Sequence, residues 1–92
     1  MTPEGKIEAY LIRQCTKKAV LCYKFTSPAN NGVPDRLIIA NNKTWFVELK
    51  APGEEPRALQ IKVMKKMTKA GATVYVADSK RQIDDILNNI LS

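Results

Sequence analysis

The segment GVPDRLIIANNKTWFVELKAPG constrains the fold of this chain most strongly. Its centre, Asn41-Asn42, separates two runs that are rich in β-branched, aromatic and aliphatic residues, Asp35–Ala40 and Lys43–Lys50. Asn tolerates the positive φ angles that tight hairpin turns require. The segment therefore predicts an antiparallel β-hairpin, and each of its two strands carries one acid.

The register of this hairpin places the two acids side by side. Counting outward from a tight loop at the central Asn pair brings Asp35 opposite Glu48. Directly opposed residues of an antiparallel pair have Cβ atoms about 4.5–5.5 Å apart and share a face of the sheet. Lys50 follows Glu48 by two positions, so it lies on the same face.

Two neighbouring carboxylates repel, and neither loses water easily unless one takes a proton. A divalent cation such as Mg²⁺ or Mn²⁺ relieves this repulsion, because hard oxygen ligands suit these ions. The ammonium group of Lys50 would then hold an anionic substrate or position an attacking water. The alternative is an exposed face on which Glu48 and Lys50 are merely solvated. The opposed Asp35, which follows a loop, favours the metal site.

The remaining elements follow from caps, breakers and hydrophobic spacing. Their order is α-β-β-β-α-β-α, which predicts an α/β fold with a mixed sheet of about four strands flanked by helices. One small domain, residues 1–92, accounts for the whole chain. The elements outside the hairpin are a helix from a Thr2 cap to about Lys18, a strand over Val20–Thr26, a helix begun by Pro56 and ended by Gly71, a strand over Ala72–Ala77, and a last helix capped by Ser79 with Ile83, Ile86, Leu87, Ile90 and Leu91 inward.

Composition narrows the chemistry. The chain has no His and only two Cys, which excludes His-based triads and most zinc enzymes. Its net charge of +6 favours an anionic partner, of which nucleic acid is the commonest. No apolar run approaches the roughly 20 residues that span a bilayer, and no signal peptide opens the chain. The expected location is therefore the cytoplasm.

The first helix offers two acids to the predicted site. Ile7, Leu11 and Cys15 define its buried stripe. Glu4 lies about 20° from the centre of this stripe and Glu8 about 60° away. Glu4 thus points towards the sheet more directly, although it would also complement the helix dipole at an exposed first turn. Glu8 is expected to be solvated at the edge of the stripe.

The second helix places an amide among apolar residues. Its predicted buried side consists of Leu59, Val63, Met67 and Ala70, with Met64 at the margin, and Gln60 falls within that side. An inward Gln needs a partner, which would be a metal-bound water, a DNA phosphate or a backbone cap. The opposite side carries four lysines, which we expect to be solvated rather than part of a DNA groove: Lys62, Lys65, Lys66 and Lys69.

With these residues in place, the chain resembles the PD-(D/E)xK nuclease superfamily. More narrowly, it is similar to a stand-alone VRR-NUC (virus-type replication-repair nuclease) domain. The resemblance covers nearly the whole chain. The matching stretches are Glu4 with Ile7, Gly32–Arg36 with its Pro34-Asp35, Phe46–Gly53 with its Glu48-Leu49-Lys50, and Gln60 followed by Gly71.

The resemblance implies a restriction-endonuclease-like core that hydrolyses DNA phosphodiester bonds with Mg²⁺ or Mn²⁺. Asp35, Glu48 and the backbone carbonyl of Leu49 would be metal ligands, and Lys50 would be the catalytic lysine. A helix-borne acid, Glu4 or alternatively Glu8, would complete the cluster. The conserved family Gln that follows the motif corresponds to Gln60, which we expect to be catalytic.

Similarity to dimeric Holliday-junction resolvases further implies a homodimer acting on branched DNA, in the cytoplasm of a bacterial or phage-infected cell. Lys24, Arg36 and Arg57 border the two loops near the acids, so they are candidates for binding DNA phosphates. The alternative is a non-catalytic DNA-binding module on the same fold, which would lack an acid or the lysine. A basic structural or inhibitory protein would explain the charge but not the opposed acids.

Overall fold

A computed structural model describes residues 1–92 of the chain and contains the elements that the sequence predicts, in the predicted order. Individual strand and helix ends differ from the expected ones by at most two residues. The elements are α1 (Pro3–Lys17), β1 (Leu21–Lys24), β2 (Arg36–Ala40), β3 (Lys43–Leu49), α2 (Ala58–Lys69), β4 (Thr73–Ala77) and α3 (Lys80–Leu91).

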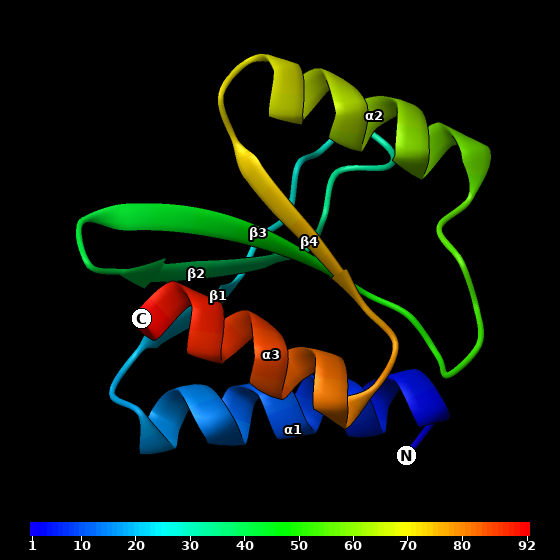
Figure 1. Cartoon of the computed structure of the whole chain (residues 1–92). Helices are drawn as coiled ribbons and strands as arrows, with labels where there is room; N and C mark the ends of the chain where they lie inside the picture. Colours follow the sequence, from blue (N-terminus) through cyan, green and yellow to red (C-terminus); the bar gives the residue numbers. More distant parts are fainter.

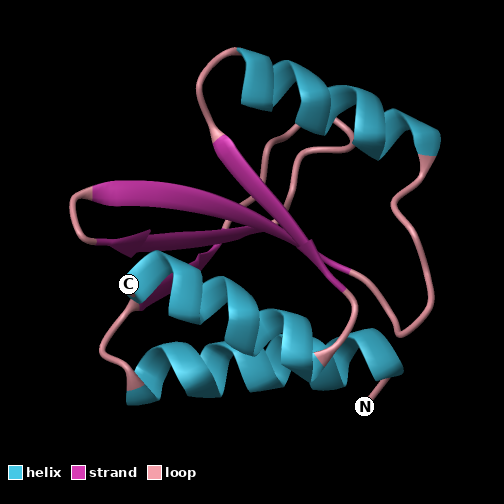
Figure 2. Cartoon of the chain, in the orientation of Figure 1, coloured by secondary structure: helices cyan, strands magenta, loops and turns pink.

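The four strands form one mixed sheet in the order β1-β2-β3-β4 (Figure 1). The first three strands pair antiparallel, whereas β4 pairs parallel to β3. A parallel partner requires a crossover, and α2 provides it. Helices α1 and α3 lie together against one face of the sheet, and α2 lies on the other side (Figure 2). The predicted α/β fold is therefore confirmed.

The main core lies between the sheet and the α1/α3 layer. Alternate residues of β3 point into it, because successive side chains of a strand face opposite sides. The predicted buried stripe of α1 is confirmed, and so is that of α3 except for Leu91, which is 38% exposed because the helix ends there. The core comprises Ile7, Leu11, Cys15, Val20, Ile38, Trp45, Val47, Leu49, Ala77, Ile83, Ile86, Leu87 and Ile90.

Helix α2 differs from the expectation. Its one buried residue is Met64, which was expected at the margin, whereas Leu59 is 52% exposed. The helix packs against β4, an edge strand, rather than over the centre of the sheet. The side of α2 that faces the sheet is therefore not the predicted one but the neighbouring side that carries Gln60 and Met64. These two residues are four positions apart, so they lie on the same side of the helix.

Local signals account for the element ends. Thr2 caps α1 by accepting a hydrogen bond from the Gly5 amide, and Ser79 caps α3 in the same way from the Gln82 amide. Gly71, with φ of 113°, ends α2 as expected. None of the helices has the length and apolar character needed to span a membrane.

The hairpin turn has the backbone that its two Asn predict. Asn41 and Asn42 have φ angles of 50° and 63°, and Ala40 pairs with Lys43. Two consecutive positive φ angles are the signature of a type I′ turn, whose twist matches that of the strands. The Asn41 side chain also donates a hydrogen bond of 3.1 Å to the Ile90 carbonyl, which ties the turn to the end of α3.

This geometry makes position 42 a test of the hairpin. Asn42→Gly should raise the free energy of unfolding by about 0.5 kcal/mol, since Gly adopts positive φ without steric cost. Asn42→Ala should lower it by about 1 kcal/mol, because Cβ crowds the left-handed backbone. Urea denaturation measures both changes. Equal stability of the two variants would contradict a left-handed residue at this position.

Candidate functional site

The register of the central hairpin brings the two acids together at one end of the sheet. Arg36 pairs with Val47, so the next step outward places Asp35 opposite Glu48. Asp35 stands just before β2, where its backbone carbonyl accepts a 2.8 Å hydrogen bond from the Phe25 amide. The side chain of Pro34 is fully buried and anchors the acid from the loop side.

Glu48 and Lys50 form a buried ion pair. Their exposed fractions are 7% and 8%, and the Lys50 Nζ lies 3.2 Å from the Glu48 Oε2. The alternative of a solvated sheet face is therefore wrong for these two residues. The reason is that α2 and the loops around the strand ends cover this face of β3, so two charged groups are taken out of water together.

Gln60 joins this pair from the first turn of α2. Its Nε2 donates a 3.1 Å hydrogen bond to the Glu48 Oε2, while its Oε1 accepts one of 2.9 Å from the Arg57 amide. The side-chain amide of Gln60 thus caps the start of the helix through its oxygen and binds Glu48 through its nitrogen. The expectation of a backbone cap is confirmed, and the inward partner in this structure is the carboxylate of Glu48.

The electrostatics of Glu48 follow from its surroundings. Burial raises the pKa of its carboxyl above the ordinary value, the ammonium of Lys50 lowers it, and the negative charges of Asp35 and Glu4 raise it again. The hydrogen bond from Gln60 and the ion pair with Lys50 are both made by Oε2. Every buried polar side-chain atom has a partner, so the unbonded Oε1 retains contact with solvent. Glu48 therefore has one oxygen that no group of the chain binds.

The oxygen atoms of the site are of the chemical type that binds a hard divalent cation. Glu48 and Asp35 offer carboxylate oxygens, which are ligands that Mg²⁺ and Mn²⁺ prefer. No three acidic or thiol side chains stand close enough in this conformation to form a metal-binding cluster. Asp35 is held by Lys24, whose Nζ lies 2.9 Å from its Oδ2. A bound cation would compete with this ammonium for Asp35.

The two acids of α1 occupy different places. Glu4 is exposed in the first turn, and its charge acts on Glu48. Glu8 makes ion pairs of 3.0 Å with the Arg36 Nε and 3.4 Å with the Lys24 Nζ. The expectation that Glu8 is solvated is therefore wrong. It failed because β1 and β2 place two cations against α1, which helix geometry alone does not reveal.

The three predicted phosphate-binding residues differ in exposure and in ion pairing. Arg36 is largely buried against Glu8, with 11% of its side chain exposed, and Lys24 is 56% exposed but paired with Asp35 and Glu8. Arg57 is exposed beside Gln60. It lines a hollow of about 390 Å³, together with Asn31 and Gly32. Of the three, Arg57 has a side chain without an ion pair to an acid.

Gly32 opens the matching stretch Gly32–Arg36 but was given no role from the sequence, and the structure places its backbone against α2. Its φ is 90°, and an added Cβ would lie 3.1 Å from Val63 Cγ2, 3.2 Å from the Leu59 carbonyl oxygen and 3.3 Å from Gln60 Cα. The loop before Asp35 therefore rests on the first turns of the helix that carries Gln60. The sequence signal that could have indicated this is a Gly between Asn and Val in a loop flanked by Pro, since Gly there permits a positive φ and a close approach.

Comparisons with known proteins agree with this geometry. No family model matches the chain. The chain is 42% identical over 78 residues to "Putative nuclease p44" of Acyrthosiphon pisum secondary endosymbiont phage 1, and this alignment covers 84% of each chain. A solved structure described as a "VRR_NUC domain" superposes with a TM-score of 0.86 and 28% identity over 96% of this chain and 97% of the other.

The mixed sheet, the strand-end acids and the lysine beside them define a nuclease-like domain. Within that class, the chain belongs to the VRR-NUC family, as the resemblance of its motifs predicts.

The close approach of Gly32 to α2 has a measurable consequence. Gly32→Ala should destabilise the chain by about 1 kcal/mol from the positive φ and by a further 1–3 kcal/mol or so from crowding. Gly53→Ala is the matched control, because Gly53 has φ of 80° but nothing within 4 Å of an added Cβ. Thermal or urea unfolding compares the two. Equal losses would mean that the loop does not press on α2.

The raised pKa of Glu48 predicts a pH-dependent stability. The folded chain holds the proton on the Glu48 carboxyl more tightly than the unfolded chain does. Protonation of Glu48 therefore stabilises the folded chain fully below pH 4.5, the ordinary pKa, and this stabilisation is lost as the pH rises through the pKa of the folded state. In metal-free buffer with EDTA, the stability of Glu48→Gln relative to the unsubstituted chain should therefore increase from about pH 4 to about pH 7.

Urea denaturation at each pH measures this difference. Glu55→Gln is the control, because Glu55 is exposed and takes part in none of the ion pairs. A difference between Glu48→Gln and the unsubstituted chain that stays constant with pH would contradict a buried carboxyl at position 48.

Proposed function

We propose that the chain is a metal-dependent endodeoxyribonuclease that hydrolyses phosphodiester bonds in DNA. The observation that carries the proposal is the buried Glu48–Lys50 ion pair, which lies opposite Asp35 and is held by Gln60. Maintaining two charges away from water is costly, and such sites are enriched in functional residues. Membership of the VRR-NUC family supports the same reading.

The proposed metal is Mg²⁺ or Mn²⁺, held by Asp35, Glu48, the backbone carbonyl of Leu49 and Glu4. When bound, such an ion would lower the pKa of a bound water and offset negative charge on the phosphate. The unbonded Oε1 of Glu48 and the influence of the Glu4 and Asp35 charges on its pKa support this ligand set.

Lys50 is the proposed catalytic cation. Its ammonium neutralises Glu48 in the structure. Once another cation compensates that carboxylate, the ammonium is available to hold the scissile phosphate or the attacking water. Gln60 holds the Glu48 Oε2 by a hydrogen bond, which would leave the other oxygen for a metal ion. In this role Gln60 contributes to catalysis by orienting a ligand.

Arg57 and Lys24 are the proposed contacts to the DNA backbone near the cleaved bond. Arg57 is exposed next to Gln60, and Lys24 lies beside Asp35, so each borders the acids. Arg36 would reach a phosphate only by leaving Glu8. Its predicted DNA contact is the least accessible of the three.

The proposed substrate is branched or four-way DNA, and the proposed assembly is a homodimer. A four-way junction must be cut on two strands to be resolved, and a twofold dimer presents two equivalent sites. The similarity to dimeric resolvases and the net charge of +6 support this choice. The phage source of the 42% identical relative supports action in the cytoplasm of a phage-infected bacterium.

The test is cleavage of linear, flapped and four-way DNA by purified protein with Mg²⁺ or Mn²⁺. The unsubstituted chain should cut branched DNA fastest and should be inactive in EDTA. Asp35→Ala and Lys50→Ala should each lower the rate by at least about 100-fold. Circular dichroism should show an intact fold, and Glu55→Ala should cut at the normal rate.

An equally active Lys50→Ala variant would overturn the mechanism. Binding of DNA without cleavage in either metal would favour a non-catalytic DNA-binding module on the same fold. Equal cleavage of linear and branched DNA would remove the structure specificity but leave the nuclease activity.

A further inference from the structure

Helix α2 carries a concentration of positive charge that nothing in the chain compensates. Its residues, Ala58–Lys69, include four lysines and no acid. All four lysines are exposed, and they lie within an arc of about 100° around the helix, at 100° per residue. They are Lys62, Lys65, Lys66 and Lys69, here named the α2 lysine face.

These lysines do not contribute to the fold through ion pairs. The cations that pair with acids in the structure are Lys24, Arg36 and Lys50, all near the hairpin acids. Neighbouring like charges on one helix repel, so the α2 lysine face lowers the stability of the isolated chain slightly. A ligand that brings negative charge would remove this repulsion.

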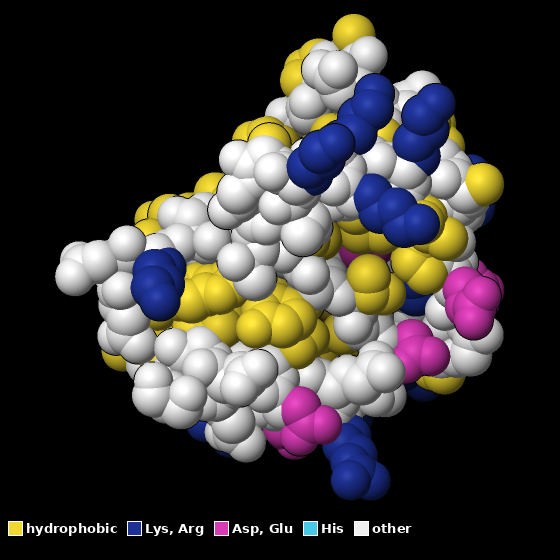
Figure 3. Space-filling view, turned by 45° about the horizontal axis from the view of Figure 1, so that its top comes forward, with side chains coloured by type: hydrophobic (Ala, Val, Ile, Leu, Met, Phe, Trp, Pro, Cys, Tyr) yellow, Lys and Arg dark blue, Asp and Glu magenta, His cyan; other side chains and the backbone are white.

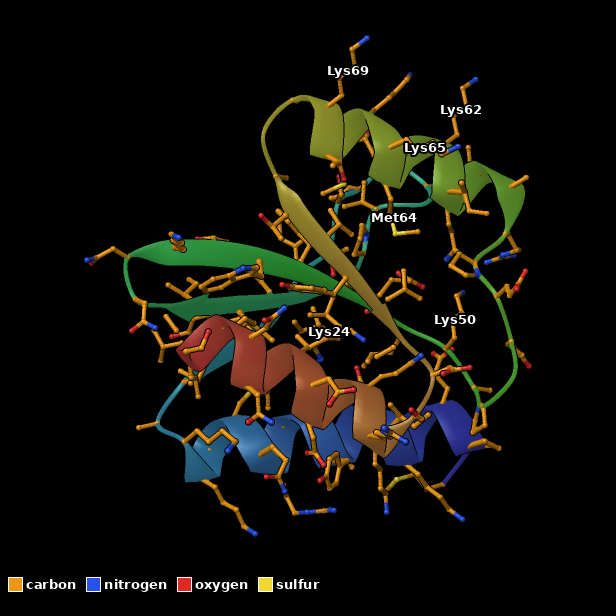
Figure 4. All side chains as sticks on the ribbon, viewed as in Figure 1. Lys24, Lys50, Lys62, Met64, Lys65 and Lys69 are labelled. Carbon is orange, nitrogen blue, oxygen red and sulfur yellow. The ribbon has the colours of Figure 1, made fainter.

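Helix α2 lies between this charge and the site, because Gln60 is about 170° around the helix from the centre of the α2 lysine face. Gln60, in the first turn, bonds to Glu48, and the helix runs away from the site from there. At a rise of about 1.5 Å per residue, Lys62 to Lys69 spans about 10 Å. Figure 4 shows Lys62 and Lys69 directed away from the sheet, whereas Lys50 lies on the sheet side of α2. Basic side chains gather over this part of the surface (Figure 3).

A second copy of the chain and a nucleic acid are the two kinds of partner considered for this basic helix face, and the surrounding residues favour one over the other. Beside the face, α2 and β4 enclose a groove of about 450 Å³ with Met64 and Val76 in its wall and Lys65 and Lys69 at its border. A second copy of the chain seated here across a twofold axis would bring the lysines of both copies together, which is unfavourable. A nucleic-acid backbone would place phosphates against them, which is favourable.

We propose that the α2 lysine face binds the backbone of a DNA arm that leaves the site and passes over the outer side of α2. The inference rests on the proposed nuclease function and reverses the expectation that these lysines are merely solvated. Phosphates of one strand advance about 3.4 Å along a duplex, so about 10 Å of helix face matches about three of them. The face therefore positions the substrate and takes no part in the chemical step.

The test is the salt dependence of DNA binding in EDTA, where no cleavage is needed. The triple variant Lys62→Gln, Lys66→Gln, Lys69→Gln should bind four-way or duplex DNA roughly 10- to 100-fold more weakly at low salt. Its slope of log affinity against log salt should be smaller by about 2–3. The matched control is Lys17→Gln, Lys18→Gln, Lys43→Gln, which removes the same charge from exposed positions away from α2.

Kinetics supply a second readout. At saturating DNA, the α2 variant should cut at the rate of the unsubstituted chain, with the loss confined to KM. Equal DNA affinity of the two triple variants would overturn the proposal while leaving the nuclease function intact. A change in sedimentation of the α2 variant with unchanged DNA affinity would assign the face to a second copy instead. Absence of DNA binding by the unsubstituted chain would overturn the proposed function itself.

Discussion

The ion pair between Lys50 and Glu48 at the end of β3 is the interaction around which the rest of the structure is arranged. Both side chains are almost fully buried, and a buried charge is tolerated only when it is paired and hydrogen-bonded. Gln60 supplies the additional bond from α2, and Gly32 lets the preceding loop approach that helix closely. Removing either partner would leave an uncompensated charge, so the sheet, the helix and the loop constrain one another at this point.

Strand β3 serves two purposes because its side chains alternate. Val47 and Leu49 point into the core beneath α1 and α3, whereas Glu48 and Lys50 point to the opposite face. The first turn of α2 contacts that face at its end, where Gln60 binds one oxygen of Glu48 and leaves the other unbonded. The hydrophobic core and the charged site are thus adjacent layers of the same strand, and the packing of one orients the other.

Much of this arrangement was predictable because its signals are local. The positive φ angles at Asn41 and Asn42 belong to residues that tolerate them, and the turn then determines which residues of β2 and β3 oppose each other. The side of α2 that packs was not predictable in this way. Met64 is buried and Leu59 exposed because β4 is an edge strand, and its place in the sheet depends on a crossover rather than on the helix sequence.

The sequence by itself determined the order of the elements, the hairpin register and the pairing of Asp35 with Glu48, since turn chemistry and strand periodicity act over a few residues. The tertiary structure alone decided that Glu48 is buried, that Gln60 binds it, and that Glu8 pairs with Arg36. These contacts join residues far apart in the chain, and their energies depend on how much water the packing of helices against the sheet removes.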